Sequence, residues 1–392
     1  MKKELPSDWK EVRLGDICDI NVNSLRESTN ENYQFKYIDL SSVKNGIIDF
    51  PNNYITFKNA PSRARRIIKI DDVIMATVRP NLKGFAYISF DPKEYICSTG
   101  FAVLTSKSEI CMKYIYQILY ANYIEKQISN MLVGSNYPAL NTSDILNIKI
   151  LLPPLYEQKR IADILSTFDD LIENLNKLIE KKELYKKGVM QRVLTGEVRF
   201  NGFTDEWENV KLKDILIVGS KDRVLDTSKY KKITIKLHNK GIEFSNIERK
   251  MADKRPFYIR KKDEIIIGKQ NYFNGSIAIV GEEFDNTICS NAIMSFTVNK
   301  NCNNKFIYFL LSRKSYMQKY YHLANGTGQK ELSESDFLNF NLLIPRLEEQ
   351  NKIAELLTLI DKDIEILKQL LHLRKLQKKG VMQKLLTGEV RV

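Results

Sequence analysis

The chain contains a long internal repeat, and this repeat restricts the possible folds more than any other feature of the sequence. Residues 157–162 (EQKRIA) return as 349–354 (EQNKIA), 186–191 (KKGVMQ) as 378–383, and 194–199 (LTGEVR) as 386–391 (LTGEVR). All three pairs are 192 residues apart without a gap. The two halves also begin alike, since Trp9–Ile17 resembles Trp207–Ile215. A repeat of this period predicts two copies of one structural unit.

The most constant part of each copy has the pattern of a long helix. Its apolar residues are spaced alternately by four and three, which is the a/d stripe of a coiled coil. The stripes are Ile161, Leu165, Phe168, Ile172, Leu175 and Ile179 in the first copy, and Ile353, Leu357, Ile360, Ile364, Leu367 and Leu371 in the second. We expect the two helices to pair antiparallel. The alternative is that each stripe packs on its own neighbouring domain.

Prolines and glycines punctuate these helices. Pro154 and Pro345 stand where a helix tolerates a missing backbone N–H, and Gly196 and Gly388 stand where a C-terminal cap is expected. Gly188 and Gly380 lie inside the helical pattern, where they mark either a kink or a close helix contact.

The remaining sequence diverges between the halves and mixes short β-rich runs with helical stretches, at Cys111–Met131 and Asn304–Tyr321. We therefore predict an α+β fold with pseudo-two-fold symmetry, in which two globular domains are joined by an antiparallel coiled coil. The expected segments are recognition domain 1 (1–152), spacer helix 1 (153–199), recognition domain 2 (200–344) and spacer helix 2 (345–392).

Charge and loop composition favour a nucleic-acid partner. Lys and Arg number 61 against 48 Asp and Glu, a net charge of +13. Arg and Lys pair with guanine, Asn and Gln pair with adenine, and other Lys side chains meet phosphate. The candidate DNA-binding residues of the first domain are Arg63, Arg65, Arg66, Arg79, Asn81, Lys83, Ser135, Asn136 and Tyr137. Those of the second are Arg255, Lys269, Gln270, Asn271, Tyr272, Asn274, Thr327, Gln329 and Lys330.

We find no catalytic motif in the sequence. The three histidines, His238, His322 and His372, stand apart, and no phosphate-binding or S-adenosylmethionine-type glycine loop occurs. A metal centre built from scattered carboxylates stays possible, with Asp71, Asp72, Asp263 and Glu264 as candidates. These residues occupy matching places before a strand in the two halves, which is more typical of a turn. The five scattered cysteines have neither zinc spacing nor a disulfide pattern. With no membrane-length apolar run or signal peptide, we expect a cytoplasmic protein without a bound metal.

The arrangement resembles the specificity (S) subunits of type I restriction-modification systems. The resemblance rests on Pro153–Ala162, on its second copy Pro345–Ala354, and on the two Leu-Thr-Gly endings, and it covers essentially the whole chain. It implies that each variable domain reads one half of a bipartite, asymmetric site in double-stranded DNA. It also implies that the helices set the spacer and dock two methyltransferase (M) subunits, which carry S-adenosylmethionine and methylate adenine.

The resemblance further implies restriction (R) subunits that use ATP and Mg²⁺, and an S subunit that has no catalytic residue and no cofactor of its own. The residues themselves leave three alternative functions open. The chain could serve a fused methylase–nuclease, it could modify DNA by itself, or it could be a coiled-coil adaptor that binds only proteins.

Overall fold

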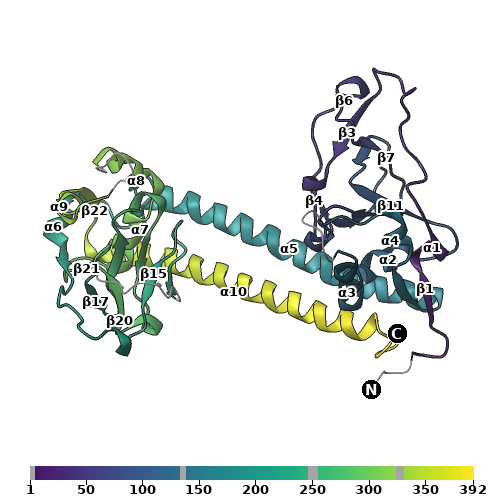
Figure 1. Cartoon of the computed structure of the whole chain (residues 1–392). Helices are drawn as coiled ribbons and strands as arrows, with labels where there is room; N and C mark the ends of the chain where they lie inside the picture. The colour runs from purple at the N-terminus through teal and green to yellow at the C-terminus, as the bar shows by residue number, and fades with distance from the viewer. Residues whose placement is uncertain (1–4, 133–137, 246–254, 324–330) are drawn as a thin grey trace. The chain divides into compact units, whose positions relative to one another are not determined.

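The computed structural model describes residues 5–132, 138–245, 255–323 and 331–392 (Figure 1). The chain forms two compact units, residues 1–176 with 370–392 (unit 1) and residues 177–369 (unit 2). Each unit therefore combines one predicted recognition domain with portions of both predicted spacer helices. We call the globular part of unit 1, up to residue 152, domain 1, and residues 200–344 of unit 2 domain 2. In the described part of the chain, no helix is both long and apolar enough to cross a membrane.

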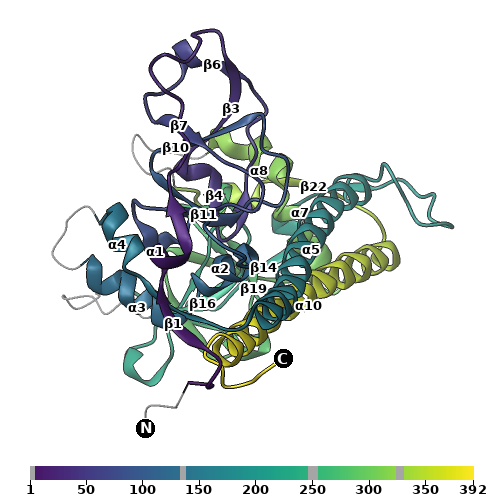
Figure 2. The same cartoon turned by 90° about the vertical axis from the view of Figure 1, so that its right-hand side faces the viewer.

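Domain 1 is an α+β structure. Its elements are β1 (Lys10–Arg13), α1 (Leu14–Ile17), β2 (Cys18–Ile20), β3 (Gln34–Ile38), β4 (Val43–Lys44), β5 (Ile47–Ile48), β6 (Ile55–Thr56), β7 (Ala64–Ile67), β8 (Val73–Ala76), β9 (Phe85–Tyr87), β10 (Tyr95–Ser98), β11 (Phe101–Ser106), α2 (Met112–Ile118), α3 (Asn122–Met131), α4 (Thr142–Leu146) and β12 (Lys149–Leu152). One sheet has the order β2-β11-β8-β9 and is antiparallel throughout. The other has the order β6-β3-β10-β7 and contains one parallel pair, β3 with β10. Figures 1 and 2 place β3, β6 and β7 on the opposite side of β11 from α3.

Domain 2 repeats most of this architecture. Its elements are β13 (Glu208–Lys211), α6 (Leu212–Ile215), β14 (Leu216–Val218), β15 (Ile233–Ile235), β16 (Ile242–Phe244), β17 (Phe257–Arg260), β18 (Ile265–Gly268), β19 (Ile277–Ile279), β20 (Thr287–Ser290), β21 (Ile293–Val298), α7 (Asn304–Leu311), α8 (Lys314–Tyr320), α9 (Glu334–Leu338) and β22 (Asn341–Ile344). From β8 and β18 onward, corresponding elements of the two domains begin 192 residues apart. The structural repeat thus extends into the part of the sequence where similarity is faint.

Continuously apolar central strands explain the cores of both domains. All four residues of β8 (VIMA) and the three isoleucines of β18 are buried, as expected for strands covered on both faces. The helical stretches predicted at Cys111–Met131 and Asn304–Tyr321 are each broken into two helices, α2 and α3 in domain 1 and α7 and α8 in domain 2. The break in domain 2 falls at Ser312, whose carbonyl accepts a hydrogen bond from the Asn239 side chain.

The two long helices are α5 (Leu155–Val193) and α10 (Leu347–Leu385). In unit 1, Ile161 and Leu165 near the start of α5 belong to the core of domain 1, together with Leu385 at the end of α10. Unit 2 has the same arrangement, with Ile353 near the start of α10 and Val193 at the end of α5. The first residues of each stripe therefore pack on their own neighbouring domain, as the alternative interpretation expects, and share that core with the end of the other helix.

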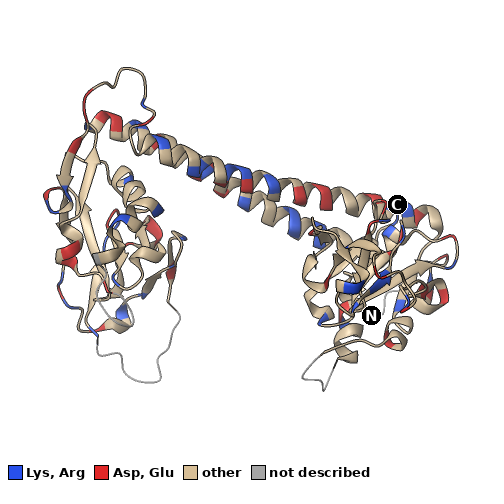
Figure 3. Cartoon of the chain, turned by 90° about the horizontal axis from the view of Figure 1, so that it is seen from above, with Lys and Arg blue, Asp and Glu red and all other residues tan. Residues whose placement is uncertain are grey.

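Ion pairs give the relative direction of the helices inside each unit. In unit 1, Lys378 of α10 pairs with Asp169 of α5, and Leu385, later in α10, shares the domain core with Ile161, earlier in α5. In unit 2, Lys182 pairs with Asp363, and Lys186, one turn later in α5, pairs with Asp361, which lies earlier in α10. Both units thus contain antiparallel helix segments, and Figure 3 shows that basic and acidic residues are interspersed along α5 and α10. Because the side chains of Lys182 and Asp363 are 37% and 58% exposed, their ion pair reports the register of the helices more than it stabilises them.

A buried Glu-Gln pair fixes the start of each long helix, which explains why this dipeptide is repeated. Glu157 is fully buried and accepts hydrogen bonds from Trp9 Nε1 (3.0 Å) and from the guanidinium of Arg391 (2.7 and 2.8 Å). Gln158 accepts from the backbone N–H of Cys111 and donates to the carbonyl of Pro153. A buried carboxylate needs such compensation, because burying an unpaired charge is costly.

The second copy keeps this anchor with one difference. Glu349 accepts two hydrogen bonds from the guanidinium of Arg199 (2.9 and 2.7 Å). Gln350 accepts from the backbone N–H of Asn303 and donates to the carbonyl of Pro345, as Gln158 does with its own partners. The indole N–H of Trp207, however, is buried without a hydrogen-bond partner in the described structure.

The glycines of the repeat fall into two kinds. Gly196 and Gly388 follow the long helices with φ of +74° and +69°, the left-handed conformation expected of a helix C-terminal cap. Gly188 and Gly380 lie within α5 and α10, and a Cβ added at either position would meet no atom within 4 Å in the described structure. Within that structure neither residue marks a close helix contact.

Candidate nucleic-acid interface

In domain 1, backbone hydrogen bonds join four segments at one end of the β2-β11-β8-β9 sheet. Thr77, which follows β8, donates to the carbonyl of Gly100 (2.8 Å), and the adjacent Thr99 donates to the carbonyl of Arg63 (2.7 Å). Leu140 donates to the carbonyl of Thr77 (2.9 Å). The loops that carry Arg63 and Arg79 therefore lie next to each other and next to the segment that begins at Pro138.

In domain 2, equivalent backbone hydrogen bonds join the corresponding segments, which differ in sequence. Lys269 donates to the carbonyl of Ala292 (3.0 Å), and Asn291 donates to the carbonyl of Pro256 (3.0 Å). Leu332 donates to the carbonyl of Lys269 (3.0 Å). We call these joined segments the reading surface of each domain: residues 63, 77–83, 99–100 and 138–140 in domain 1, and 255–256, 269–275, 291–292 and 331–332 in domain 2.

Side chains on the two reading surfaces differ although the backbone scaffold repeats. At the 192-residue offset, Arg79 corresponds to Asn271, and Leu82 corresponds to Asn274. A fixed backbone with exchanged polar side chains is suited to presenting different base-contacting groups from one type of scaffold, because specificity depends on groups that reach the base edges.

The predicted residues of the loop after β8 lie at the surface of domain 1. Arg79 and Asn81 are exposed, and Lys83 is half-buried. Arg79 (φ +49°) and Lys83 (φ +54°) both have left-handed backbone, on either side of the short 3-10 helix Pro80–Leu82. Non-glycine residues with this conformation are uncommon and concentrate at functional sites. The Lys83 ammonium pairs with Glu125 at 3.0 Å, so part of its charge is already compensated.

The basic cluster after Pro61 is divided between surface and packing roles. Arg63 is exposed. The guanidinium of Arg65 donates to the carbonyl of Ala64 and stacks 4.5 Å from the centre of the Phe57 ring. Arg66 donates to the hydroxyl of Ser24, and burial lowers the pKa of its guanidinium. Arg63 is therefore the member of this cluster placed best to meet DNA.

Domain 2 exposes three of its predicted loop residues, Gln270, Asn271 and Asn274, and half-buries Lys269. Tyr272 does not belong with them, because it is completely buried and donates its hydroxyl to the carbonyl of Leu311 (2.9 Å). The sequence-based assignment of Tyr272 as a DNA-contacting residue is therefore corrected: its ring supports the loop from inside, and this burial also raises the pKa of its hydroxyl.

Arg255 is the remaining predicted residue that the structure describes. Arg255 is half-buried, with its guanidinium 5.9 Å from the centre of the Phe257 ring. Six predicted DNA-binding residues, namely Ser135, Asn136, Tyr137, Thr327, Gln329 and Lys330, lie outside the described residues.

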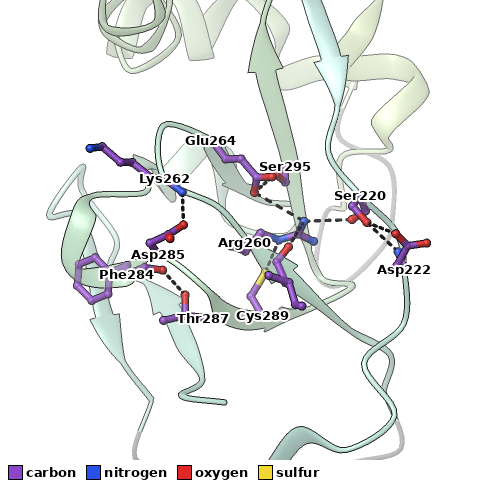
Figure 4. A network of polar contacts seen from close by, with 11 residues as sticks. Ser220, Asp222, Arg260, Lys262, Glu264, Phe284, Asp285, Thr287, Cys289 and Ser295 are labelled. Carbon is purple, nitrogen blue, oxygen red and sulfur yellow. Dashed lines mark hydrogen bonds and ion pairs between the residues drawn. The ribbon is translucent and has the colours of Figure 1, made fainter. Parts of the chain in front are cut away.

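A buried polar network lies beneath the reading surface of domain 2 (Figure 4). Arg260 donates to the Cys289 sulfur (3.0 Å) and the Ser220 carbonyl (3.3 Å), and it lies 3.9 Å from Glu264. Glu264 in turn accepts from the Ser295 hydroxyl (2.7 Å). These contacts hold the Ser220 segment against β17 and β18, beside a polar cleft of about 220 Å³ that Lys269 helps to line.

The acidic residues that were candidate metal ligands lie in turns or act as buried hydrogen-bond acceptors. Asp71 (φ +68°) and Asp263 (φ +66°) occupy corresponding left-handed turn positions. Asp72 accepts from the backbone of Lys69 and from the Thr105 hydroxyl, both at 2.7 Å, and burial raises the pKa of its carboxyl. Among the described residues, no three His, Cys, Asp or Glu side chains are grouped so that they could hold a metal ion.

Sequence reasoning missed the turns that support these loops, such as Thr99–Gly100 and Asn291–Ala292. The signal that could have found them is the 192-residue offset itself, which places both turns at equivalent positions.

Comparison with known proteins identifies the class of protein that this repeated architecture represents. The family model for the type I restriction modification DNA specificity domain matches twice, at residues 6–183 and 204–373. The chain belongs to this family and is a specificity subunit of a type I restriction-modification system. Such a subunit is a DNA-recognition component without catalytic activity.

Individual relatives agree with this assignment. The chain is 27% identical to the type I restriction enzyme MjaVIII specificity subunit of Methanocaldococcus jannaschii, across 99% of this chain and 94% of that protein. Its fold is similar to the type I S subunit of M. genitalium, with a TM-score of 0.64, 16% identity and coverage of 98% and 97%. A chain solved in work on complex assembly and conformational transition of a type I system has a TM-score of 0.56, 22% identity and coverage of 99% and 100%.

Proposed function

We propose that the two domains read the two halves of a bipartite, asymmetric DNA site, one half each. The observation that carries this proposal is the pair of reading surfaces, which have equivalent backbone hydrogen bonds but different side chains. Two domains that share a backbone structure but present different side chains are suited to binding two different half-sites. A net charge of +13 supports contact with phosphates in addition.

The exposed side chains suggest different base preferences for the two domains. Arg63 and Arg79 of domain 1 have the guanidinium geometry that matches guanine O6 and N7. Gln270, Asn271 and Asn274 of domain 2 carry amides, which pair bidentately with adenine N6 and N7. We therefore assign a guanine-containing half-site to domain 1 and an adenine-containing half-site to domain 2.

The long helices are proposed to form an antiparallel coiled coil that sets the spacer and docks two M subunits. The repeated helix faces support docking, because two identical partners require two equivalent surfaces. Leu184 (70% exposed) precedes Gly188 by one helical turn, and Leu376 (53% exposed) precedes Gly380 in the same way. We propose these two patches as contacts for M subunits. S-adenosylmethionine then belongs to the M subunits, and ATP with Mg²⁺ belongs to R subunits that join the complex.

One substitution tests the division of labour between the domains. Asn271→Arg places in domain 2 the residue that domain 1 carries at the equivalent position, Arg79. Co-expressed with its M subunit, this variant should change the base requirement in one half-site, detected by genome-wide mapping of methylated adenines. The other half-site and the spacer serve as internal controls, and a change in both half-sites would contradict the proposal.

A further inference from the structure

A strained hairpin tip adjoins the reading surface of domain 2. The strands β15 and β16 are connected by six residues, Lys236–Gly241. Three of these residues have left-handed backbone: His238 (φ +62°), Asn239 (φ +56°) and Gly241 (φ +81°). Two successive non-glycine residues in this conformation are unfavourable unless surrounding contacts hold them.

Contacts with the reading surface hold the tip in place. The backbone N–H of His238 donates to the carbonyl of Asn274 (2.8 Å), and that of Asn239 donates to the carbonyl of Gly275 (2.9 Å). The side chain of Asn239 donates to the carbonyl of Ser312 (3.0 Å). A Cβ at Gly275 would come within 2.9 Å of the Asn239 nitrogen, so glycine is required at this close approach.

Domain 1 has a shorter version of the same device. Its strands β4 and β5 are joined by only Asn45 and Gly46, both left-handed, with φ of +49° and +86°. Asn45 donates to the carbonyl of Lys83 (3.1 Å), which is the counterpart of Gly275 in the repeat. Each domain therefore docks a hairpin tip on its reading loop, and domain 2 has four more residues in that tip.

The extra residues in domain 2 carry groups that suit nucleic-acid contact. His238 and Lys240 are exposed, whereas Asn239 supplies the side-chain bond that docks the tip. An imidazole combines a donor and an acceptor nitrogen and can thus read a base edge. An exposed ammonium group is suited to a phosphate oxygen.

We propose that the tip Lys236–Gly241 is a second DNA-reading element of domain 2, in which His238 determines one base of the half-site and Lys240 contacts a phosphate. This inference rests on the proposed function of domain 2. It extends the reading surface beyond the loop that follows β18, to a hairpin for which domain 1 has only a two-residue counterpart.

The test uses the chain in complex with its M subunit. His238→Gly removes the imidazole while allowing the left-handed backbone, so thermal stability should be unchanged or higher. The preference at one base of one half-site should relax by roughly 10- to 100-fold, measured by methylation of a random-sequence duplex library. Lys240→Ala should weaken binding to all sequences and lower the slope of log K against log salt by about 1.

Asn286→Gly is the matched control, because Asn286 is exposed, has left-handed backbone (φ +58°) and lies outside the reading surface. It should leave the half-site unchanged. A wild-type complex without a sequence preference would overturn the proposed function itself. A wild-type complex with a bipartite site that His238→Gly and Lys240→Ala leave unchanged, in base preference and in salt slope, would overturn only the role of the tip.

Discussion

The four repeated glycines of the long helices provide a sharp test of the helix structure. Gly188 and Gly380 lie within helices, are exposed, and leave open space around an added Cβ. Alanine is favoured over glycine inside a helix by about 0.8–1 kcal/mol, so Gly188→Ala and Gly380→Ala should each stabilise the isolated chain by about that amount. Gly196→Ala and Gly388→Ala should destabilise it instead, because alanine is strained at φ of +74° and +69°.

Urea and thermal denaturation, both followed by circular dichroism, would measure these changes. For a domain of 150–250 residues, a change of 1 kcal/mol corresponds to a shift of about 2–4 °C in Tm. The same Gly188→Ala and Gly380→Ala variants should bind the M subunit more weakly, because the proposed docking patches include these glycines. Loss of stability on Gly188→Ala would refute the reasoning, since it would mean that the glycine is needed within the helix itself.

Three further experiments test separate parts of the structure. Trp9→Phe should cost about 1.5–3 kcal/mol more than Trp207→Phe in chemical denaturation, because only Trp9 donates to a buried carboxylate. Equal costs would contradict the difference between the two anchors. Leu165→Ala should cost about 2.7–5 kcal/mol, against about 0.5 kcal/mol for the exposed Leu171→Ala, because only the former opens a cavity; similar values would exclude Leu165 from the core of domain 1. Four residues inserted at equivalent places in α5 and α10 should lengthen the spacer in a methylation map, and altered half-sites with an unchanged spacer would refute the spacer role.

The helices and their boundaries were the most predictable part of the fold. Local rules of helix capping and heptad spacing determine where α5 and α10 begin and end, and the gapless repeat allows each rule to be checked twice. The sequence left open whether Ile161 and Ile353 would pack against a partner helix or belong to the domain cores, as they do. A heptad stripe has the same pattern whether its partner is a helix or a sheet.

The reading surfaces were predictable in position but not in the role of each residue. Asn271 and Tyr272 are neighbours in one polar-aromatic loop, yet one is exposed and the other completely buried. A 3-10 turn, rather than composition, decides which of them faces inward.

The strand pairing of Lys36 with Tyr95 in the β3–β10 sheet also escaped prediction, because parallel pairing joins segments far apart in sequence.

Exchange of residues 1–152 for the recognition domain of another specificity subunit tests the central claim most directly. The hybrid would be co-expressed with its M subunit, and methylated adenines would be mapped across the genome. Two domains that read independently predict a new sequence in one half-site, with the other half-site and the spacer unchanged. A change in both half-sites, or a single continuous site in the wild-type map, would contradict the account.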